Sequence, residues 1–211
     1  MMKLGCMSLS YSRSFSEGRM TLETFIETAY NLGLDGIDIH TGSFASTDDA
    51  YLRDTRMRCL KRGLAISYIG ISNNFGKPES ELPGEVATIK RWIDVAARMG
   101  VPLVRIFAAW IPQNESEEVV WARMISCMKE VTAYGRERGV VLGLHNHNHG
   151  CVTRTGGDVL RILREVDDPY FSHILDTGQY VGSPGSSGAE GRLDPTYDFY
   201  GSIEQTAPYA I

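Results

Sequence analysis

The stretch that decides the fold is residues 139–149, Gly-Val-Val-Leu-Gly-Leu-His-Asn-His-Asn-His. Here a glycine follows a long helical segment, a short apolar run follows the glycine, and polar side chains follow the apolar run. The same order of helix, glycine and short apolar run occurs four times along the chain. This alternation of helical segments with short β-rich runs predicts βα units and a parallel sheet.

Working outward from this stretch, the sequence predicts six strands and six helices. The strands are expected at residues 3–9, 36–40, 65–72, 103–107, 140–146 and 171–176, and the helices at 21–32, 48–62, 85–99, 115–138, 155–166 and 195–205. An open doubly wound sheet is one alternative, but no GxGxxG motif follows the first strand and no P-loop is present. The predicted fold is therefore an α/β (β/α)₈ TIM barrel that is truncated after about six βα units, with strands seven and eight missing.

Composition limits the classes of protein that fit. The 211 residues, 43% of them hydrophobic, are enough for one substantial core, so a single domain spanning residues 1–211 is expected. The chain has 21 basic and 26 acidic residues and no basic run, which argues against nucleic acid as a partner. No apolar run is long enough for a membrane span or a signal peptide. Four scattered cysteines fit free thiols, and a cytoplasmic location is expected.

Polar side chains at the C-terminal ends of strands carry the chemistry of barrels of this kind. His145, His147 and His149 stand at two-residue spacing, so they would share one face if the strand continued that far. Imidazole is a common transition-metal ligand, and its pKa near neutrality suits proton transfer. Alternatively, His147 and His149 lie on a solvated loop while His145 is hydrogen-bonded inside the barrel. Asp176 ends the next strand, where a carboxylate either binds a metal or caps a turn.

Five segments together resemble one known family. They are KLGCMSLSYS (3–12), LGLDGIDIH (32–40), LVRIFAAW (103–110), VVLGLHNHNHG (140–150) and HILDTGQY (173–180). In this order they resemble the xylose isomerase-like TIM barrel superfamily. That superfamily contains sugar phosphate isomerases and epimerases and is related to AP endonuclease family 2.

The resemblance implies a divalent metal ion, Mn²⁺, Zn²⁺, Co²⁺ or Mg²⁺, held by a Glu on strand five, an Asp on strand six, a His on strand seven and a Glu on strand eight. Position by position, Asp176 matches the strand-six ligand and His145 stands where the family has the strand-five Glu. The other two ligands would fall beyond Ile211. A histidine supplies no negative charge, so His145 favours Zn²⁺, Mn²⁺ or Co²⁺ over Mg²⁺, and it could also act as the catalytic base itself.

Further residues are predicted to line the site. His40 lies near the mouth and is expected to contact substrate, Trp110 is expected to form an apolar wall for a sugar ring, and His147 is expected to orient hydroxyls. Gln179 stands where the family often has a substrate-side histidine. Asp38 and the interior residue Arg105 are expected to form a buried ion pair under the site.

The function implied is isomerisation or epimerisation of a small sugar or sugar phosphate by metal-assisted proton abstraction next to the carbonyl. Dehydration of the inosose or dehydroshikimate type begins with the same step and stays open. A third possibility is a sugar-binding relative without turnover. The acidic balance argues against an apurinic endonuclease. An open six-strand arc would expose its edges and interior, so we expect either aggregation or self-association into a homo-oligomer if this is the whole molecule. Alternatively, the sequence is a fragment of a longer chain of roughly 250 residues or more.

Overall fold

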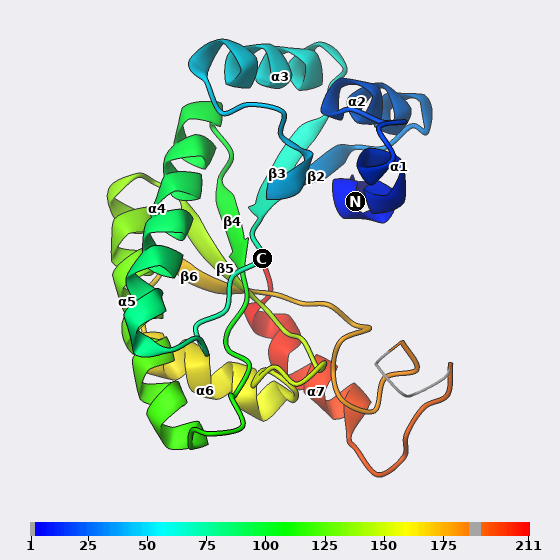
Figure 1. Ribbon diagram of the computed structural model, residues 1–211. Helices are drawn as coiled ribbons and strands as arrows, with labels where there is room; N and C mark the ends of the chain where they lie inside the picture. Colours follow the sequence, from blue (N-terminus) through cyan, green and yellow to red (C-terminus); the bar gives the residue numbers. More distant parts are fainter. Residues whose placement is uncertain (1–2, 186–190) are drawn as a thin grey trace.

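The computed structural model describes residues 3–185 and 191–211. Its centre is one parallel sheet whose six strands lie in chain order (Figure 1). The strands are β1 (Gly5–Met7), β2 (Gly36–His40), β3 (Ala65–Gly70), β4 (Leu103–Ile106), β5 (Val141–His145) and β6 (Phe171–Ile174). The fold is therefore α/β and TIM-barrel-like, as predicted. Among the described residues β1 and β6 do not pair with each other, so the sheet stays open.

Helices follow the strands and lie along the outer side of the curved sheet (Figure 1). They are α1 (Ser12–Ser16), α2 (Leu22–Asn31), α3 (Asp49–Lys61), α4 (Leu82–Met99), α5 (Glu117–Glu137), α6 (Gly156–Val166) and α7 (Phe199–Thr206), with short 3₁₀ turns at Ser8–Tyr11, Thr41–Ser43, Glu79–Glu81 and Ala207–Tyr209. Among the described residues, no helix combines the length and apolar character that a membrane crossing needs.

The core forms where the apolar stripe of each helix meets the outer face of the sheet. In α4 the buried side chains Val86, Ile89 and Ile93 recur at three- and four-residue spacing, as an amphipathic helix requires. Trp92 and Trp121 are also buried and pack in this core. The glycines that end four of the predicted helices, at positions 33, 63, 100 and 139, all adopt the left-handed conformation with φ between 67° and 70°.

Several element bounds differ from the prediction for local reasons. The first strand is shorter because residues 8–11 turn into a 3₁₀ helix. Helix α4 begins three residues before the predicted start, since Pro83 fits the first turn of a helix, where its missing N–H costs nothing. The sixth strand ends at Ile174, before Asp176.

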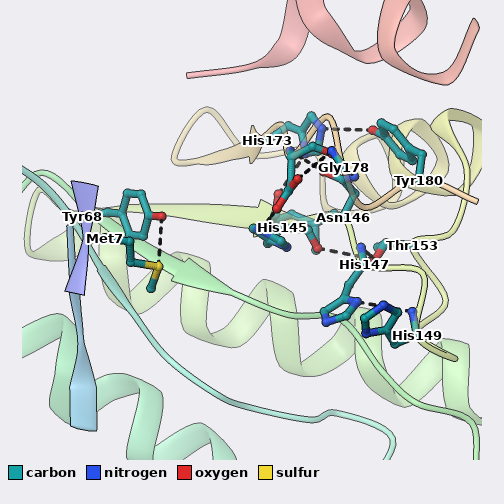
Figure 2. Close-up of polar contacts among 12 residues, drawn as sticks. Met7, Tyr68, His145, Asn146, His147, His149, Thr153, His173, Gly178 and Tyr180 are labelled. Carbon is teal, nitrogen blue, oxygen red and sulfur yellow. Dashed lines mark hydrogen bonds and ion pairs between the residues drawn. The ribbon is translucent and has the colours of Figure 1, made fainter. Parts of the chain in front are cut away.

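A buried hydrogen-bond chain connects β5, β6 and α7. His173 Nδ1 lies 2.9 Å from Leu144 O, and the Tyr180 hydroxyl lies 3.1 Å from His173 Nε2 (Figure 2). The same hydroxyl lies 2.9 Å from Thr206 Oγ1 on α7. Burial lowers the pKa of His173 to about 4, so its ring is neutral at neutral pH. Nδ1 then donates to the carbonyl of Leu144, while the Tyr180 hydroxyl donates to Thr206 Oγ1 and its oxygen lies against Nε2.

Gly135 allows the end of α5 to pack directly on the following strand. A β-carbon at this position would lie 2.6 Å from Val140 O and would overlap Leu142 Cδ2. We expect Gly135→Ala to lower the free energy of unfolding by about 1–3 kcal/mol, because the added methyl forces the helix away from the sheet. Urea denaturation measures this change.

The matched control is Gly84→Ala in the first turn of α4, where a β-carbon would meet nothing within 4 Å. That substitution is expected to be neutral or to stabilise the chain by up to about 1 kcal/mol, because alanine loses less conformational entropy in a helix. Equal effects of the two substitutions would contradict the close packing of α5 on β5.

Candidate active site

Two asparagine side chains continue the sheet beyond the ends of its strands. After β5, Asn146 Nδ2 donates to Asp176 O at 2.8 Å and Asn146 Oδ1 accepts from Asp176 N at 2.8 Å. After β3, Asn73 makes the same pair with the backbone of Phe107, at 2.9 and 2.8 Å. Each asparagine therefore replaces a rung of the ladder and fixes the backbone of a residue at the C-terminal end of the neighbouring strand.

His145 is the last residue of β5 (Figure 2), and Asp176 follows β6 at the same end of the sheet. His145 Nε2 lies 3.3 Å from Asp176 Oδ2, and the two side chains are 15% and 40% exposed. Burial raises the pKa of Asp176, but the contacts with His145 and with the Gly178 N–H outweigh burial, so the net pKa lies below its usual value. Asp176 is therefore ionised at neutral pH.

An ionised Asp176 decides where neutral His145 carries its proton. The carboxylate only accepts, so the proton is favoured on Nε2, which faces it. Nδ1 then holds the free lone pair. This atom is buried and has no hydrogen-bond partner among the described residues. The pair can thus present one unprotonated imidazole nitrogen whose ring is oriented by a carboxylate, the arrangement of a general base.

His147 and His149 continue the chain past β5 on a loop (Figure 2). The His147 backbone N–H donates to Thr153 Oγ1 at 3.0 Å, and the His149 N–H donates to His147 Nδ1 at 3.3 Å. Burial and the neighbouring imidazoles of His149 and His145 lower the pKa of His147 to about 4. His147 is therefore neutral, with its proton on Nε2 available as a donor.

Aromatic rings surround the two histidines. The ring of Phe107 lies 5.3 Å from the rings of both His145 and His147, and the ring of Trp110 lies 5.7 Å from that of His147. Trp110 Nε1 donates to His149 O at 2.7 Å, which ties this loop to the ring cluster. Trp110 thus lies beside Phe107 and His147, and its role as an apolar wall stays a prediction. The role of Phe107 was not predicted; the sequence placed it as the last residue of the fourth strand, which in the structure ends at Ile106.

His40 and Gln179 are placed differently. His40 Nδ1 accepts from the Gly42 N–H at 3.2 Å and its Nε2 lies 3.0 Å from Ser72 Oγ, so both ring nitrogens are engaged locally. The backbone N–H of Gln179 donates to Asp176 O at 3.2 Å, and its buried side-chain Oε1 has no hydrogen-bond partner in the part of the chain that the structure describes. Gln179 therefore lies in the same turn as Asp176, while His40 remains at the end of β2.

The predicted ion pair between Asp38 and Arg105 is wrong. The guanidinium lies 4.2 Å above the ring of Phe107, and within residues 3–185 and 191–211 its Nε and Nη1 atoms have no hydrogen-bond partner. Burial raises the pKa of Asp38 to about 6, against the effect of hydrogen bonds from Ser67 and Tyr68. The two strand partners of Arg105 in the register are glycines, which leave room for its side chain to reach the Phe107 ring instead of Asp38.

The described residues supply half of a metal site. Donor atoms 3.3 Å apart, as in His145 and Asp176, could be neighbouring ligands of one ion. No third His, Cys, Asp or Glu joins them, and the described part of the chain holds no group of three such residues that could bind a metal. These residues alone do not fit the expected divalent ion, so the chemistry proposed below uses the side chains only.

A cavity of about 740 Å³ lies elsewhere, between α6 and the C-terminal residues 208–211, and is lined by residues such as Leu163, Phe171 and Ile211. It stands at the N-terminal end of β6, where barrels of this type carry stabilising residues rather than chemistry. We therefore place the candidate site at the other end of the sheet, with His145 and Asp176.

A parallel βα sheet with histidines and a carboxylate at its C-terminal edge is the architecture of the (β/α)₈-barrel class. Within that class, residues 26–202 match the xylose isomerase-like TIM barrel family, and the chain belongs to it. No curated protein matches the sequence.

Solved structures share the fold at low sequence identity. A protein described as the probable 3-DHS dehydratase AsbF from Bacillus anthracis is 17% identical with a TM-score of 0.76. The D-psicose 3-epimerase from Clostridium cellulolyticum H10 is 15% identical with a TM-score of 0.75. A xylose isomerase domain protein from Planctomyces limnophilus is 12% identical with a TM-score of 0.73. In each case the similarity covers 99% of this chain and 71% of the other.

Proposed function

We propose that this chain acts on a small sugar or sugar-derived carbonyl compound as an isomerase or epimerase, by removing a proton from the carbon next to the carbonyl. The observation that carries the proposal is the contact of His145 with Asp176 beside the rings of Phe107 and Trp110. Membership in a family whose solved relatives include sugar epimerases supports it.

In the proposed reaction His145 Nδ1 takes the proton from carbon, and the carbonyl compound becomes an enediolate. Asp176 stabilises the imidazolium that forms, as the carboxylate of a catalytic triad does. Return of the proton to the other face of the same carbon gives the epimer, and return to the adjacent carbon gives the isomer. Because Nδ1 is buried, the ring of His145 has to shift before a substrate reaches it.

Other side chains are proposed to hold the substrate. His147 can donate its Nε2 proton to a substrate oxygen, and Trp110 offers an apolar ring face. Gln179 presents a buried amide oxygen that needs a donor. His40 contributes the edge of its ring rather than its nitrogens, which already bond Gly42 and Ser72.

A dehydratase is the second candidate. The same enediolate can expel a neighbouring hydroxyl as water, and a structure described as a dehydratase shares the fold over 99% of this chain. Since both reactions begin with proton abstraction, the shared first step is the one to measure.

The test is proton exchange in D₂O, followed by ¹H NMR, with a panel of ketoses and cyclic polyol-derived ketones. The expected result is loss of the signal of the proton next to the carbonyl for at least one compound, with an epimer, isomer or dehydrated product. A panel in which sugars bind but no proton exchanges would contradict the proposal and identify the chain as a sugar-binding relative.

A further inference from the structure

Three loops lie at the C-terminal edge of the sheet, at residues 71–78 after β3, 107–116 after β4 and 146–155 after β5. Trp110, in the second loop, is bonded to both of the others. Its backbone N–H donates to Asn74 Oδ1 at 3.0 Å, and its ring Nε1 donates to His149 O at 2.7 Å. Trp110 therefore connects the first loop to the loop that carries His147 and His149.

The backbone also joins the second loop to the third. The Val152 N–H donates to Ala109 O at 2.9 Å, and Trp110 forms an antiparallel bridge with Cys151. The third loop thus lies against the second as one strand lies against another. The loop of His147 is therefore held by the backbone around Trp110 as well as by its ring.

The side-chain oxygen of Asn74 fixes the backbone of Trp110. Asn74 Oδ1 accepts from the Trp110 N–H and, at 2.7 Å, from the Gly76 N–H, so both of its lone pairs are used. Beside it, the Phe75 N–H donates to Ala108 O at 3.0 Å. Loss of this one oxygen would take the acceptor from two partly buried backbone N–H groups, which costs free energy.

Gly76 lets the first two loops approach each other closely. A β-carbon at this position would overlap Trp110 O and would lie 2.8 Å from the Trp110 carbonyl carbon. Gly76 O also accepts from Arg123 Nη2 of α5 at 3.1 Å, and Arg123 forms an ion pair with Glu115. The two loops therefore meet through backbone atoms, and a side chain at position 76 would separate them.

Asn74 is itself attached to helix α4. Its backbone N–H donates at 3.0 Å to Oε2 of Glu85, which lies in the first turn of α4. Glu85 Oε1 lies 2.6 Å from Lys77 Nζ, and the Glu85 side chain is 16% exposed. The first loop is thus fixed to a helix and can support Trp110.

We propose that Asn74 is a positioning residue, which holds Trp110 and, through Trp110, the loop of His147 where a substrate binds. The inference rests on the proposed function, because that function assigns substrate contacts to Trp110 and His147. Asn74 touches no reacting group and acts only through the backbone of Trp110.

Hydrogen exchange of the full chain without any ligand tests the connection between the loops. In Asn74→Ala, the Trp110 Nε1–H and the Val152 N–H are expected to exchange about ten- to a hundredfold faster, because the loops separate more often. The Leu142 N–H, which donates to Tyr170 O in the sheet, is expected to keep its rate. ¹H–¹⁵N NMR measures all three rates, and Trp110→Phe identifies the signal of the Trp110 ring.

Further variants test whether the oxygen of Asn74 is the cause. Asn74→Asp keeps an acceptor at the same place and is expected to restore slow exchange. Gly76→Ala keeps Asn74 but separates the loops, so it is expected to accelerate the same two N–H groups, and it decides the question if Asn74→Ala does not fold. The matched control Asn114→Ala changes an exposed asparagine of the Trp110 loop and is expected to change none of the rates.

A kinetic measurement tests the effect on the substrate, with the compound of the panel whose proton exchanges. Asn74→Ala is expected to raise KM about tenfold and to change kcat by less than about threefold. The difference arises because His145 belongs to β5 itself and Asn146 fixes the backbone of Asp176, so neither depends on the loop of Trp110.

Three results would overturn the inference. The first is unchanged exchange of the Trp110 ring and the Val152 N–H in both Asn74→Ala and Gly76→Ala. The second is exchange of Leu142 that accelerates to the same degree, which would indicate a general loss of stability. The third is a fall in kcat at unchanged KM. Faster exchange in the loops without turnover of any compound would instead reject the proposed reaction and keep the connection between the loops.

Discussion

A chain in which glutamine replaces His145 is expected to exchange substrate protons with solvent about 10²–10⁴ times more slowly than the unmodified chain. Glutamine keeps a donor for the Asp176 carboxylate but has no nitrogen that accepts a proton near neutral pH. The free energy of unfolding is expected to change by about 1 kcal/mol, because the His145 side chain is only 15% exposed while glutamine keeps a donor for Asp176. Exchange in D₂O on the best compound of the panel measures the rate.

Two further substitutions test the role of the Asp176 carboxylate and provide a matched control for His145→Gln. Asp176→Asn preserves the size of the side chain but removes its negative charge. We expect it to slow exchange as well, because an amide holds the proton on His145 Nε2 less strongly and stabilises the imidazolium less. His149→Gln makes the same exchange of side chains as His145→Gln on an exposed loop residue, and it is expected to keep the rate near that of the unmodified chain. Normal exchange in His145→Gln would rule out this residue as the base.

The buried ring of His173 is expected to make folding sensitive to acid. Its pKa is lowered from 6.5 to about 4 in the folded chain, so the unfolded chain binds a proton first as the pH falls. The stability that depends on neutral His173 is thus complete above about pH 6.5 and is lost progressively toward pH 4. The whole shift corresponds to about 3 kcal/mol. Urea denaturation across this range measures the loss.

Comparison with a variant isolates the contribution of His173. Asp38, with its pKa raised to about 6, acts in the opposite direction, while His147 acts in the same direction, so the total pH dependence mixes several groups. His173→Asn keeps a donor for Leu144 O but cannot titrate, and its pH dependence is expected to be flatter. Tyr180→Phe removes the hydroxyl that donates to Thr206 Oγ1 and contacts His173 Nε2, and it is expected to cost about 1–3 kcal/mol at neutral pH. Parallel stability curves for the unmodified chain and His173→Asn would contradict this account.

The strand order and the helix ends were predictable because they depend on local patterns. Four glycines in the left-handed conformation mark the ends of helices in sequence and structure alike. The cap of α2 was less visible. Thr21 and Thr24 bond each other's backbone N–H groups, although the sequence lacks the acidic or amide residue that usually signals this reciprocal cap.

The site was predictable only in part. The predicted strand ends place His145 next to Asp176, because the two residues end neighbouring parallel strands at the same edge of the sheet. The asparagine pairs and the path of Arg105 depend on contacts between segments about thirty residues apart, which no local pattern records. The glycines opposite Arg105 on the two neighbouring strands were a usable signal. Two glycines leave open space beside the arginine, and this space lets its side chain take a path other than one toward Asp38.

Because the side chains of Asn73 and Asn146 bond the backbone of the neighbouring strand, the positions of the candidate catalytic residues do not depend on the sequence of the loops. Because Asn146 binds the backbone of Asp176 through its own side chain, residues 147–152 are not needed to hold that carboxylate in place. Evolution, or a protein engineer, can then exchange such loops for new ones while the reacting groups keep their positions. A scaffold built in this way can acquire new substrates without first rebuilding its catalytic edge.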